Sequence, residues 1–310
     1  MSSPRVTVIG DSTLDVTIRT GEALRAGGDA HATISLVPGG QGANVAVRLA
    51  RAGVPVRLAT ALADDMAGRM LLAALEADRV ALATAAPSEH SGVVMVLVDR
   101  AGERSMLSDR VHLELRAVRA ACVGVEWVHC SGYPLADDDG GDELAAHLGT
   151  LGPTRVSVGG GSLQFDAKRA AKVRDRLSAA RPRLLVFGLD EAAALLDTPH
   201  PSLPAAADAI ASAFPGAVAV VTGGAAGSAA AGPGFALSVA AHGPSTPMVD
   251  ATGAGDGYAA CLIAGLLDGD WPPGVPALRT AMESATHLGA LVSRVVGAQG
   301  RVGGERASQG

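Results

Sequence analysis

Short runs of aliphatic and β-branched residues alternate along this chain with longer segments in which apolar positions recur at helical spacing. Alternation of this kind is typical of βαβ units, in which helices cover both faces of a mostly parallel sheet. The pattern therefore predicts an α/β fold. Strands are expected at residues 5–9, 56–60, 127–130, 156–158, 184–187 and 217–222, and helices at residues 42–51, 66–77, 137–149, 165–179, 202–213 and 258–267.

Two stretches interrupt this alternation. Residues 13–19 with 31–37, and residues 91–98 with 103–108, alternate apolar and polar positions around turn residues and have no helix between them. We expect two antiparallel hairpins that form a small second sheet, or lid.

The predicted organisation is one large α/β domain over residues 1–298, with lid strands inserted at about residues 12–37 and 91–108. The last residues, 299–310, are rich in Gly, Arg and Ser, which favours a flexible tail. Of the 310 residues, 48% are hydrophobic and 18% are charged. This balance provides a sizeable core and excludes disorder for most of the chain.

The net charge of −6 disfavours acidic partners. Nucleic acid and anionic membrane surfaces would be repelled, so neither is expected as a partner. Residues 209–249 lack charged side chains, but glycine and proline interrupt them too often for a membrane span, and no secretory segment is expected. Cys122, Cys130 and Cys261 have no CxxC spacing, which suits a reducing cytoplasm.

Several common catalytic signatures are missing from the sequence. Lys168 and Lys172 are the only lysines and neither follows a glycine, which excludes a Walker A loop. No HxxxH pair or GxSxG elbow occurs, which excludes a zincin and the commonest type of esterase. The turn at Gly10 and Asp11 lacks the further glycines of a dinucleotide fingerprint. The remaining candidate for phosphate binding lies near the C-terminus.

That candidate is the segment DATGAGDG at residues 250–257, which precedes an apolar helical pattern. Small residues permit a tight turn, and successive N–H groups at a helix start can converge on an anion. Asp256 would repel a phosphate there unless it serves the reaction, for example as a general base toward an acceptor hydroxyl. An ordinary helix start with a favourably placed Asp is the alternative, and spacing alone leaves both open.

Two further polar segments lie near the N-terminus. In the segment PGGQGAN, Gly39 and Gly40 permit close approach of the backbone to a ligand, and Asn44 can both donate to and accept from a polyol. Asp11 and Asp15 follow the first strand, where ligands of open α/β sheets bind. Taken alone, each segment is better explained as a turn or a helix start.

Taken together and in this order, these segments resemble the ribokinase-like (PfkB) family of carbohydrate kinases. The boxes GAN, ending at Asn44, and GAGD, ending at Asp256, are its most specific marks, with Thr222, Gly223 and Gly224 between them. The resemblance spans nearly the whole chain. It implies a doubly wound α/β domain with a β-sheet lid, and phosphorylation of a hydroxymethyl group of a sugar or nucleoside with ATP and Mg²⁺.

The resemblance also implies a role for each matching residue. Asp256 would be the catalytic base. The phosphoryl group would lie in an anion hole formed by Gly253, Ala254 and Gly255. The acceptor would be held by Asp11, Asp15, Gly39, Gly40 and Asn44, and the nucleotide would be flanked by Thr222, Gly224 and Gly227. Glu191 would act on Mg²⁺ through water, and Asp250 would help to bind the monovalent cation, such as K⁺, that many members use.

Three positions depart from the family's pattern. Ala251 replaces a Thr, Gly188 replaces the Asn of the N-x-x-E motif that ends at Glu191, and Gly159 replaces a strand-end Asp. The last two lie on the metal and nucleotide side, so magnesium handling is the property they bring into question.

The leading hypothesis is an ATP-dependent kinase for a small sugar of the ribose, fructose or 2-keto-3-deoxy sugar acid type. A nucleoside kinase of the same fold is an alternative, although the predicted lid contains no Phe, Tyr or Trp to face a base. A non-catalytic sugar- or nucleotide-binding relative is the second alternative, and the retained Asp256 argues against it. Lid sheets in this family often pair, so a homodimer through the lid is expected.

Overall fold

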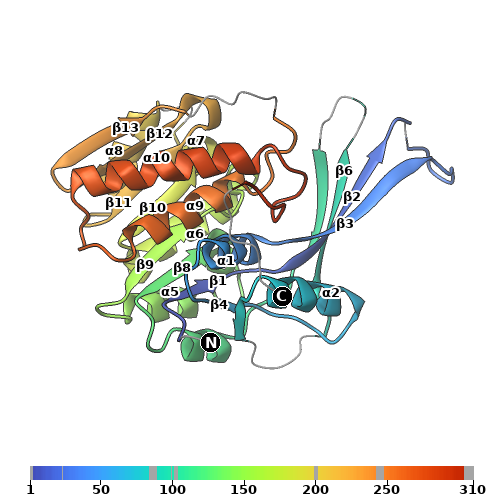
Figure 1. Ribbon diagram of the computed structural model, residues 1–310, viewed down its shortest axis with the longest axis horizontal. Coiled ribbons are helices and arrows are strands. Elements are labelled where there is room, and N and C mark those ends of the chain that lie inside the picture. Colours follow the sequence, from blue (N-terminus) through green and yellow to red (C-terminus); the bar gives the residue numbers. More distant parts are fainter. Residues whose placement is uncertain are drawn as a thin grey trace.

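The computed structural model forms an α/β domain with two sheets (Figure 1). It describes residues 3–22, 24–83, 89–98, 100, 104–198, 202–241 and 248–303. Within these ranges the large sheet has the strand order β13-β12-β11-β10-β9-β8-β1-β4-β5, and the small sheet has the order β3-β2-β6-β7. The predicted α/β fold with a mostly parallel sheet and a separate small sheet is confirmed.

The large sheet is parallel except at one edge. Its parallel strands are β1 (Val6–Ile9), β4 (Val56–Ala59), β5 (Ala81–Ala83), β8 (Trp127–Ser131), β9 (Arg155–Gly159), β10 (Leu184–Gly188) and β11 (Val218–Thr222). The antiparallel strands β12 (Ser228–Gly232) and β13 (Phe235–Val239) complete it. The sequence pattern missed β5 and β12, which are rich in alanine and so lack the β-branched signal of a strand, and it also missed β13.

Helices cover both faces of this sheet. They are α1 (Gln41–Arg51), α2 (Met66–Ala77), α3 (Leu115–Ala121), α4 (Gly132–Ala136), α5 (Gly141–Gly149), α6 (Ala167–Ala180), α7 (Leu189–Leu196), α8 (Leu203–Ala213), α9 (Ala254–Leu266) and α10 (Val275–Val292), with 3-10 turns at Leu163–Phe165 and Gly224–Ala226. The helix predicted over residues 137–149 begins later than expected, because α5 starts only at Gly141, and the separate short helix α4 ends at Ala136, before the predicted range.

The strands have apolar side chains on both faces, which places a core on each side of the sheet. On β10, Leu184 and Val186 pack in the core that also contains residues of α1, α9 and α10. Leu185 and Phe187 point to the opposite side and pack with residues of α5, α6, α7 and α8. This division follows from the two-residue period of a strand. In Figure 1, α9 and α10 lie across the viewer's side of the large sheet.

The small sheet, here called the lid, consists of β2 (Thr13–Thr20), β3 (Ala32–Gly39), β6 (Gly92–Val98) and β7 (Arg104–Asp109). β2 pairs with β3 and β6 pairs with β7 in antiparallel hairpins, and a parallel pairing of β2 with β6 joins the two. The lid projects from the large sheet at the right of Figure 1. Residues 23, 99 and 101–103 of the predicted lid and residues 304–310 of the predicted tail lie outside the described residues.

The topology gathers the predicted site at one edge of the large sheet. Because β1, β8, β9, β10 and β11 are parallel, their carboxyl ends meet at the same edge. The chain passes from β1 into the lid through residues 10–12 alone, and α1 begins directly after β3. Among the described helices, none is long and apolar enough to cross a membrane.

Candidate active site

A cavity of about 390 Å³ lies between the lid and the carboxyl edge of the large sheet. Its size is typical of a pocket for a small molecule. It is lined by lid residues (Thr13, Asp15, Val94, Met106), by the starts of α1 and α9 (Gln41, Asn44, Gly255, Asp256) and by strand ends (Ser131, Gly159, Gly188, Thr222), among others. A larger hollow of about 590 Å³ near the beginnings of β9 and β10 has no carboxylate among its lining residues and none of the predicted site residues.

Asp256 and Asn44 meet in this cavity from two different helices. Asn44 on α1 donates its Nδ2 to Asp256 Oδ2 on α9 over 2.7 Å. The backbone at the start of α1 lies so close to β1 that a Cβ on Gly42 would be 2.6 Å from the Gly10 backbone, which explains why glycine stands there. Gly40 caps the helix with φ 92°, a conformation that favours glycine.

The pKa of the Asp256 carboxyl lies near neutral pH. Burial raises its pKa to about 7, and the nearby negative charge of Glu191 acts in the same direction, whereas the hydrogen bond from Asn44 opposes the rise. A carboxylate with this pKa is ionised in a large fraction of molecules at neutral pH and still basic enough to accept a proton. This is the property required of a general base.

The start of α9 has backbone N–H groups without an acceptor among the described residues. Gly253 caps the helix with φ 77°, and a Cβ there would lie 2.5 Å from the Cβ of Ala298. Ala254 N–H donates to Ala251 O over 3.2 Å, whereas the N–H groups of Gly255 and Asp256 have no acceptor among the described residues. Free N–H groups at a helix start attract anions, so these two donors are the ones left for a ligand.

The predicted acceptor residues divide into two groups. Asp15, Gly40 and Asn44 line the cavity. Thr13 donates its hydroxyl to Asp15 over 2.8 Å, and burial raises the pKa of Asp15 to about 6. Gly39 lies beneath Asp15, where a Cβ would be 2.2 Å from Oδ2. Asp11 faces a neighbouring cavity and pairs with Arg110.

Of the three residues predicted to flank a nucleotide, only Thr222 lines the cavity. Gly224 and Gly227 lie in the turn between β11 and β12, and neither is part of the cavity wall. Gly227 has φ 87°, and a Cβ there would lie 2.2 Å from the Val239 carbonyl oxygen. These two glycines therefore shape the turn next to Thr222.

Glu191 reaches the cavity with both carboxylate oxygens already bonded to the backbone. Oε1 accepts from Ser162 N–H over 2.9 Å, and Oε2 accepts from Gly188 N–H over 3.0 Å. Burial raises the pKa of Glu191 in spite of these bonds. Gly188 has room for a side chain, since the nearest atom to an added Cβ is Glu191 Oε2 at 3.6 Å. Gly159 has none, because a Cβ would lie 2.4 Å from the Val186 carbonyl oxygen.

Asp250 is buried and does not line the cavity. Its Oδ1 accepts from Thr252 N–H over 3.0 Å and from the Thr252 hydroxyl over 2.6 Å, and its Oδ2 accepts from Gly297 N–H over 3.1 Å. Asp250 therefore ties the loop before α9 to the segment that follows α10.

The sequence analysis missed several residues of the cavity wall. The Arg110 guanidinium lies over the ring of Tyr133, whose hydroxyl donates to Ser162 Oγ over 2.7 Å. Gln41 Oε1 and Ser131 Oγ are buried and have no hydrogen-bond partner among the described residues. Such atoms in a cavity wall are available for hydrogen bonds to water or to a polar ligand. A search of the residues that follow each predicted strand would have found Ser131 and Tyr133.

His129 also lines the cavity, from within β8. Its Nδ1 is hydrogen-bonded to Ser157 Oγ over 2.9 Å, and burial lowers its pKa to about 4. The imidazole is therefore neutral at physiological pH and belongs to the packed sheet.

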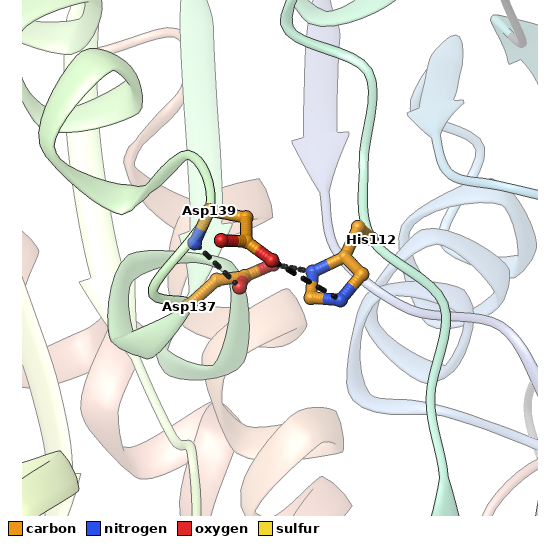
Figure 2. Close-up of side chains that lie close together, drawn as sticks. All are labelled: His112, Asp137 and Asp139. Atoms are coloured by element: carbon orange, nitrogen blue, oxygen red, sulfur yellow. Dashed lines mark hydrogen bonds and ion pairs between the residues drawn. The ribbon is translucent and has the colours of Figure 1, made fainter.

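A second cavity of about 460 Å³ adjoins the first, since Arg110 and Tyr133 line both. His112, Asp137 and Asp139 lie close together in its wall (Figure 2). His112 Nδ1 is hydrogen-bonded to Asp137, and Nε2 lies 3.9 Å from Asp139. The bond to Asp137 raises the pKa of His112 and so favours imidazolium, which has no lone pair for a metal. We interpret this cluster as ion pairing.

Comparison with known proteins gives one family and many similar folds. The family model described as pfkB family carbohydrate kinase matches residues 3–302. No curated protein sequence matches. Adenosine kinase from Sinorhizobium meliloti has 20% identity and a TM-score of 0.79, over 97% of both chains. Ribokinase from Giardia lamblia has 14% identity and a TM-score of 0.79, over 96% of this chain and 95% of that one. A fructokinase from Vibrio cholerae O395, solved with fructose, ADP and calcium ion, has 23% identity and a TM-score of 0.76, over 96% of both. At these identities the likeness is one of fold.

Proposed function

Because this chain belongs to the pfkB family of carbohydrate kinases, and is thus a sugar kinase, we propose that it transfers the γ-phosphoryl group of ATP to a hydroxymethyl group of a small sugar. The observation that carries this proposal is the position of Asp256. Its carboxylate lies in the cavity at the start of α9, beside the free N–H groups of that helix and 2.7 Å from Asn44. A base and an anion cradle therefore face the same space.

In this proposal Asp256 is the general base. It accepts the proton of the acceptor hydroxyl while the hydroxyl oxygen forms its bond to the γ-phosphorus, and the bond from that phosphorus to the bridging oxygen of ADP breaks. Asn44 holds the carboxylate in place and favours its ionised form by donating a hydrogen bond.

The free N–H groups of Gly255 and Asp256 hold the transferring phosphoryl group. Charge that develops on the equatorial oxygens is stabilised by such donors because they are already oriented before the reaction. Thr222, Gly188 and Ala251 form the adjoining part of the wall, where the nucleotide binds. Gly253 lets the loop turn tightly enough to present these groups, and Gly224 and Gly227 support Thr222 from behind.

A kinase of this family implies a divalent cation, for which we propose Mg²⁺. When bound with the nucleotide, the cation neutralises charge on the phosphates. Glu191 fits an indirect role, since its oxygens already accept two backbone N–H groups and a water can use the remaining lone pairs. A role for Asp250 near a monovalent cation such as K⁺ is supported by its burial and by its position in the loop before α9.

The acceptor is held between the lid and α1. Asp15, Asn44 and the orphaned oxygens of Gln41 and Ser131 suit the hydroxyl groups of a sugar. Asp11 supports this wall through Arg110, and Gly39 lets Asp15 lie close to the backbone. The Arg110 cation at the same end suits a sugar acid, so ribose, fructose and 2-keto-3-deoxy sugar acids are the acceptor classes we propose.

A nucleoside acceptor is less well supported. A nucleobase needs an aromatic face, and Tyr133 lines the cavity. The guanidinium of Arg110 lies 3.8 Å from the centre of its ring, and that of Arg169 lies 5.2 Å from it. With these two cations near the ring, stacking of a base is obstructed.

The outer face of the lid supports a homodimer. Asp15, Val94 and Met106 face the cavity, and the two-residue period places Ile34, Leu36, Met95 and Leu107 on the opposite face, where they are between 37% and 61% exposed. Covering these side chains with a second copy would remove apolar surface from water. The three free cysteines support our proposal of a cytoplasmic location.

Release of ADP, measured against a panel of sugars, sugar acids and nucleosides, tests the proposed function. We expect turnover with at least one sugar or sugar acid, and the Asp256→Asn protein serves as the matched control. Turnover with nucleosides alone would select the nucleoside-kinase alternative. Binding of sugar by calorimetry without ADP release from any acceptor would select the non-catalytic alternative.

A further inference from the structure

The segment after α10, residues 297–301, lies against α1 and is held there by buried arginines. Arg48 Nη2 donates to the carbonyl oxygens of Ala298 and Gly300, each over 2.8 Å. Arg51 Nη1 donates to the carbonyl oxygen of Gln299 over 2.8 Å. Arg48 is only 2% exposed and Arg51 only 7%. Burying two guanidinium groups is unfavourable unless they are well paired, so this contact is a fixed part of the fold.

The same segment brings the side chain of Gln299 to the reactive end of the cavity. Gln299 Nε2 donates to Asn44 Oδ1 over 3.1 Å, and Asn44 Nδ2 donates to Asp256 Oδ2 over 2.7 Å. Three side chains from three parts of the chain thus form one hydrogen-bonded series, which we call the amide relay: Gln299, Asn44 and Asp256. In both amides the NH₂ group donates toward Asp256: that of Gln299 donates to Asn44, and that of Asn44 donates to Asp256.

The direction of the relay matters because an amide has two unlike ends. An ionised carboxylate accepts hydrogen bonds and cannot donate, so only the Nδ2 end of Asn44 stabilises Asp256. Rotation of the Asn44 amide by half a turn would bring Oδ1 against the carboxylate and repel it. Gln299 opposes this rotation in the orientation that it adopts here, because its Nε2 donates to Asn44 Oδ1 and the rotation would bring two NH₂ groups together.

We infer that Gln299 is a positioning residue, which acts through Asn44 to keep a hydrogen-bond donor directed at the general base. This inference rests on the proposed function, in which Asp256 is the general base. The amide relay itself follows from the observed hydrogen bonds alone. Gln299 is not itself a lining residue of the cavity and reaches it through Asn44, and among the described residues no hydrogen bond joins Gln299 to Asp256.

The other charged groups that act on Asp256 come from separate elements. Glu191 on α7 and Asp15 on β2 raise its pKa, and Arg48 on α1 lowers it. Gln299 is uncharged, so replacing it with another uncharged side chain leaves these electrostatic effects in place. A change in the titration of Asp256 in such a variant then reports on the amide relay.

The test is the Gln299→Met variant, which keeps the length of the side chain and removes its donor. The Asp256 titration is followed by carboxyl ¹³C NMR of protein labelled at Asp, with the resonance assigned from its loss in Asp256→Asn. We expect the pKa of Asp256 to rise. We also expect turnover at pH 6 to fall about tenfold, with a change below about twofold at pH 9, as a rise of about one unit in the pKa of the base implies.

Three further variants isolate the route of the effect. In an Asn44→Ala background, adding Gln299→Met is expected to leave the Asp256 titration unchanged, because the relay is already broken. Arg301→Gln lies on the same segment and pairs with Asp78, away from Asn44; it is expected to leave the pH profile as in the wild type. Gln299→Ala removes the donor with different packing and is expected to act in the same direction as Gln299→Met.

An unchanged Asp256 titration in both Gln299 variants would overturn the inference, and so would an equal shift in the Asn44→Ala background. The NMR readout needs no turnover. If the wild type released no ADP with any acceptor, the proposed function would fail while the titration still decided the role of Gln299.

Discussion

The guanidinium carbon of Arg110 lies 3.8 Å from the centre of the Tyr133 ring, and the same guanidinium pairs with the carboxylate of Asp11. Arg110 follows the last strand of the lid, and its side chain thus contacts both the loop after β1 and the first turn of α4. Burial lowers the pKa of Arg110, which nevertheless stays charged because the guanidinium is so basic. This contact lies at the end of the cavity where we propose that the acceptor binds.

Replacing Arg110 with Met should weaken acceptor binding. Asp11 would lose its cationic partner and Tyr133 its stacked neighbour, so the wall would loosen and the KM for the acceptor should rise about tenfold. The KM for ATP should change by less than about twofold. Arg169→Met is the matched control, since Arg169 also faces Tyr133 but lies farther from it and makes no bond to Asp11. Equal effects of the two variants on the acceptor KM would contradict this role.

Asp256→Asn should bind the acceptor and lose turnover. The neutral amide cannot accept the hydroxyl proton, and a positioned base is worth about 10²–10⁴-fold in rate. Steady-state kinetics with calorimetric binding of the acceptor measures both properties. A rate near that of the wild type would show that another group is the base.

Ionisation of Asp256 should increase turnover and decrease the stability of the fold as the pH rises. Because the base must be ionised, turnover should rise with pH through about 7, and Asp15, with a pKa of about 6, should contribute at the acid end. The folded-state pKa of Asp256 lies above its ordinary value of 3.8, so folding favours the neutral form. Its contribution to stability is complete below about pH 4 and is lost as pH rises through 7.

The Asn side chain in the Asp256→Asn variant is uncharged at every pH, so this variant does not lose that contribution to stability as the pH rises. Its free energy of unfolding should exceed that of the wild type by about 1–3 kcal/mol at pH 8, and the difference should shrink toward pH 4. Urea unfolding at the two pH values measures this. A constant difference between the proteins would mean that the Asp256 carboxyl titrates alike in the folded and unfolded states.

Asn44→Ala should weaken acceptor binding by about 1–3 kcal/mol, because a polar group of the pocket loses its partner. It should also shift the acid limb of the activity profile to higher pH, since Asp256 loses the hydrogen bond that favours its ionised form. Calorimetry gives the first quantity and a pH–rate profile the second. Unchanged affinity for the acceptor would place Asn44 outside the binding surface.

The metal side of the cavity allows a gain-of-function prediction. We expect activity that requires Mg²⁺ at an elevated half-saturating concentration, because Gly188 supplies no amide to order the cation's waters. Gly188→Asn should lower that concentration, and the backbone permits it, with φ −68° and space for a Cβ. Glu191→Gln should raise it. A magnesium titration at fixed ATP compares the three proteins. Identical curves would mean that this segment does not serve the metal, and full activity in chelator would exclude phosphoryl transfer by this route.

The parts of the site that were predictable from the sequence are those whose chemistry is local. Gly40 and Asn44 open one helix, and Gly253 and Asp256 open another, so each short segment carries its own turn and its own polar group. The α/β alternation likewise follows from runs of a few residues, although alanine-rich strands such as β12 gave no signal.

The rest depends on contacts between distant parts of the chain. Arg110 and Tyr133 are 23 positions apart in the sequence and meet only because the residue that follows β7 lies against the first turn of α4. Gln299 falls in a segment whose composition favours a flexible tail, yet its carbonyl oxygen and that of Gly300 accept hydrogen bonds from Arg51 and Arg48. The sequence holds no local pattern for such pairings, because each partner is ordinary in its own surroundings.

The acceptor contacts that we propose are divided between the lid and the large sheet, which are joined, on the N-terminal side, by residues 10–12 alone. Asp15 belongs to the lid, whereas Asn44 and Asp256 belong to helices of the large sheet. In the proposed function, the residues of phosphoryl transfer therefore lie outside the lid, whereas part of the acceptor surface lies in the lid. Exchange of the lid strands with those of a relative is therefore a way to change the acceptor while the residues of phosphoryl transfer stay the same. Mutations that accumulate in the lid during evolution can diversify substrates in the same way.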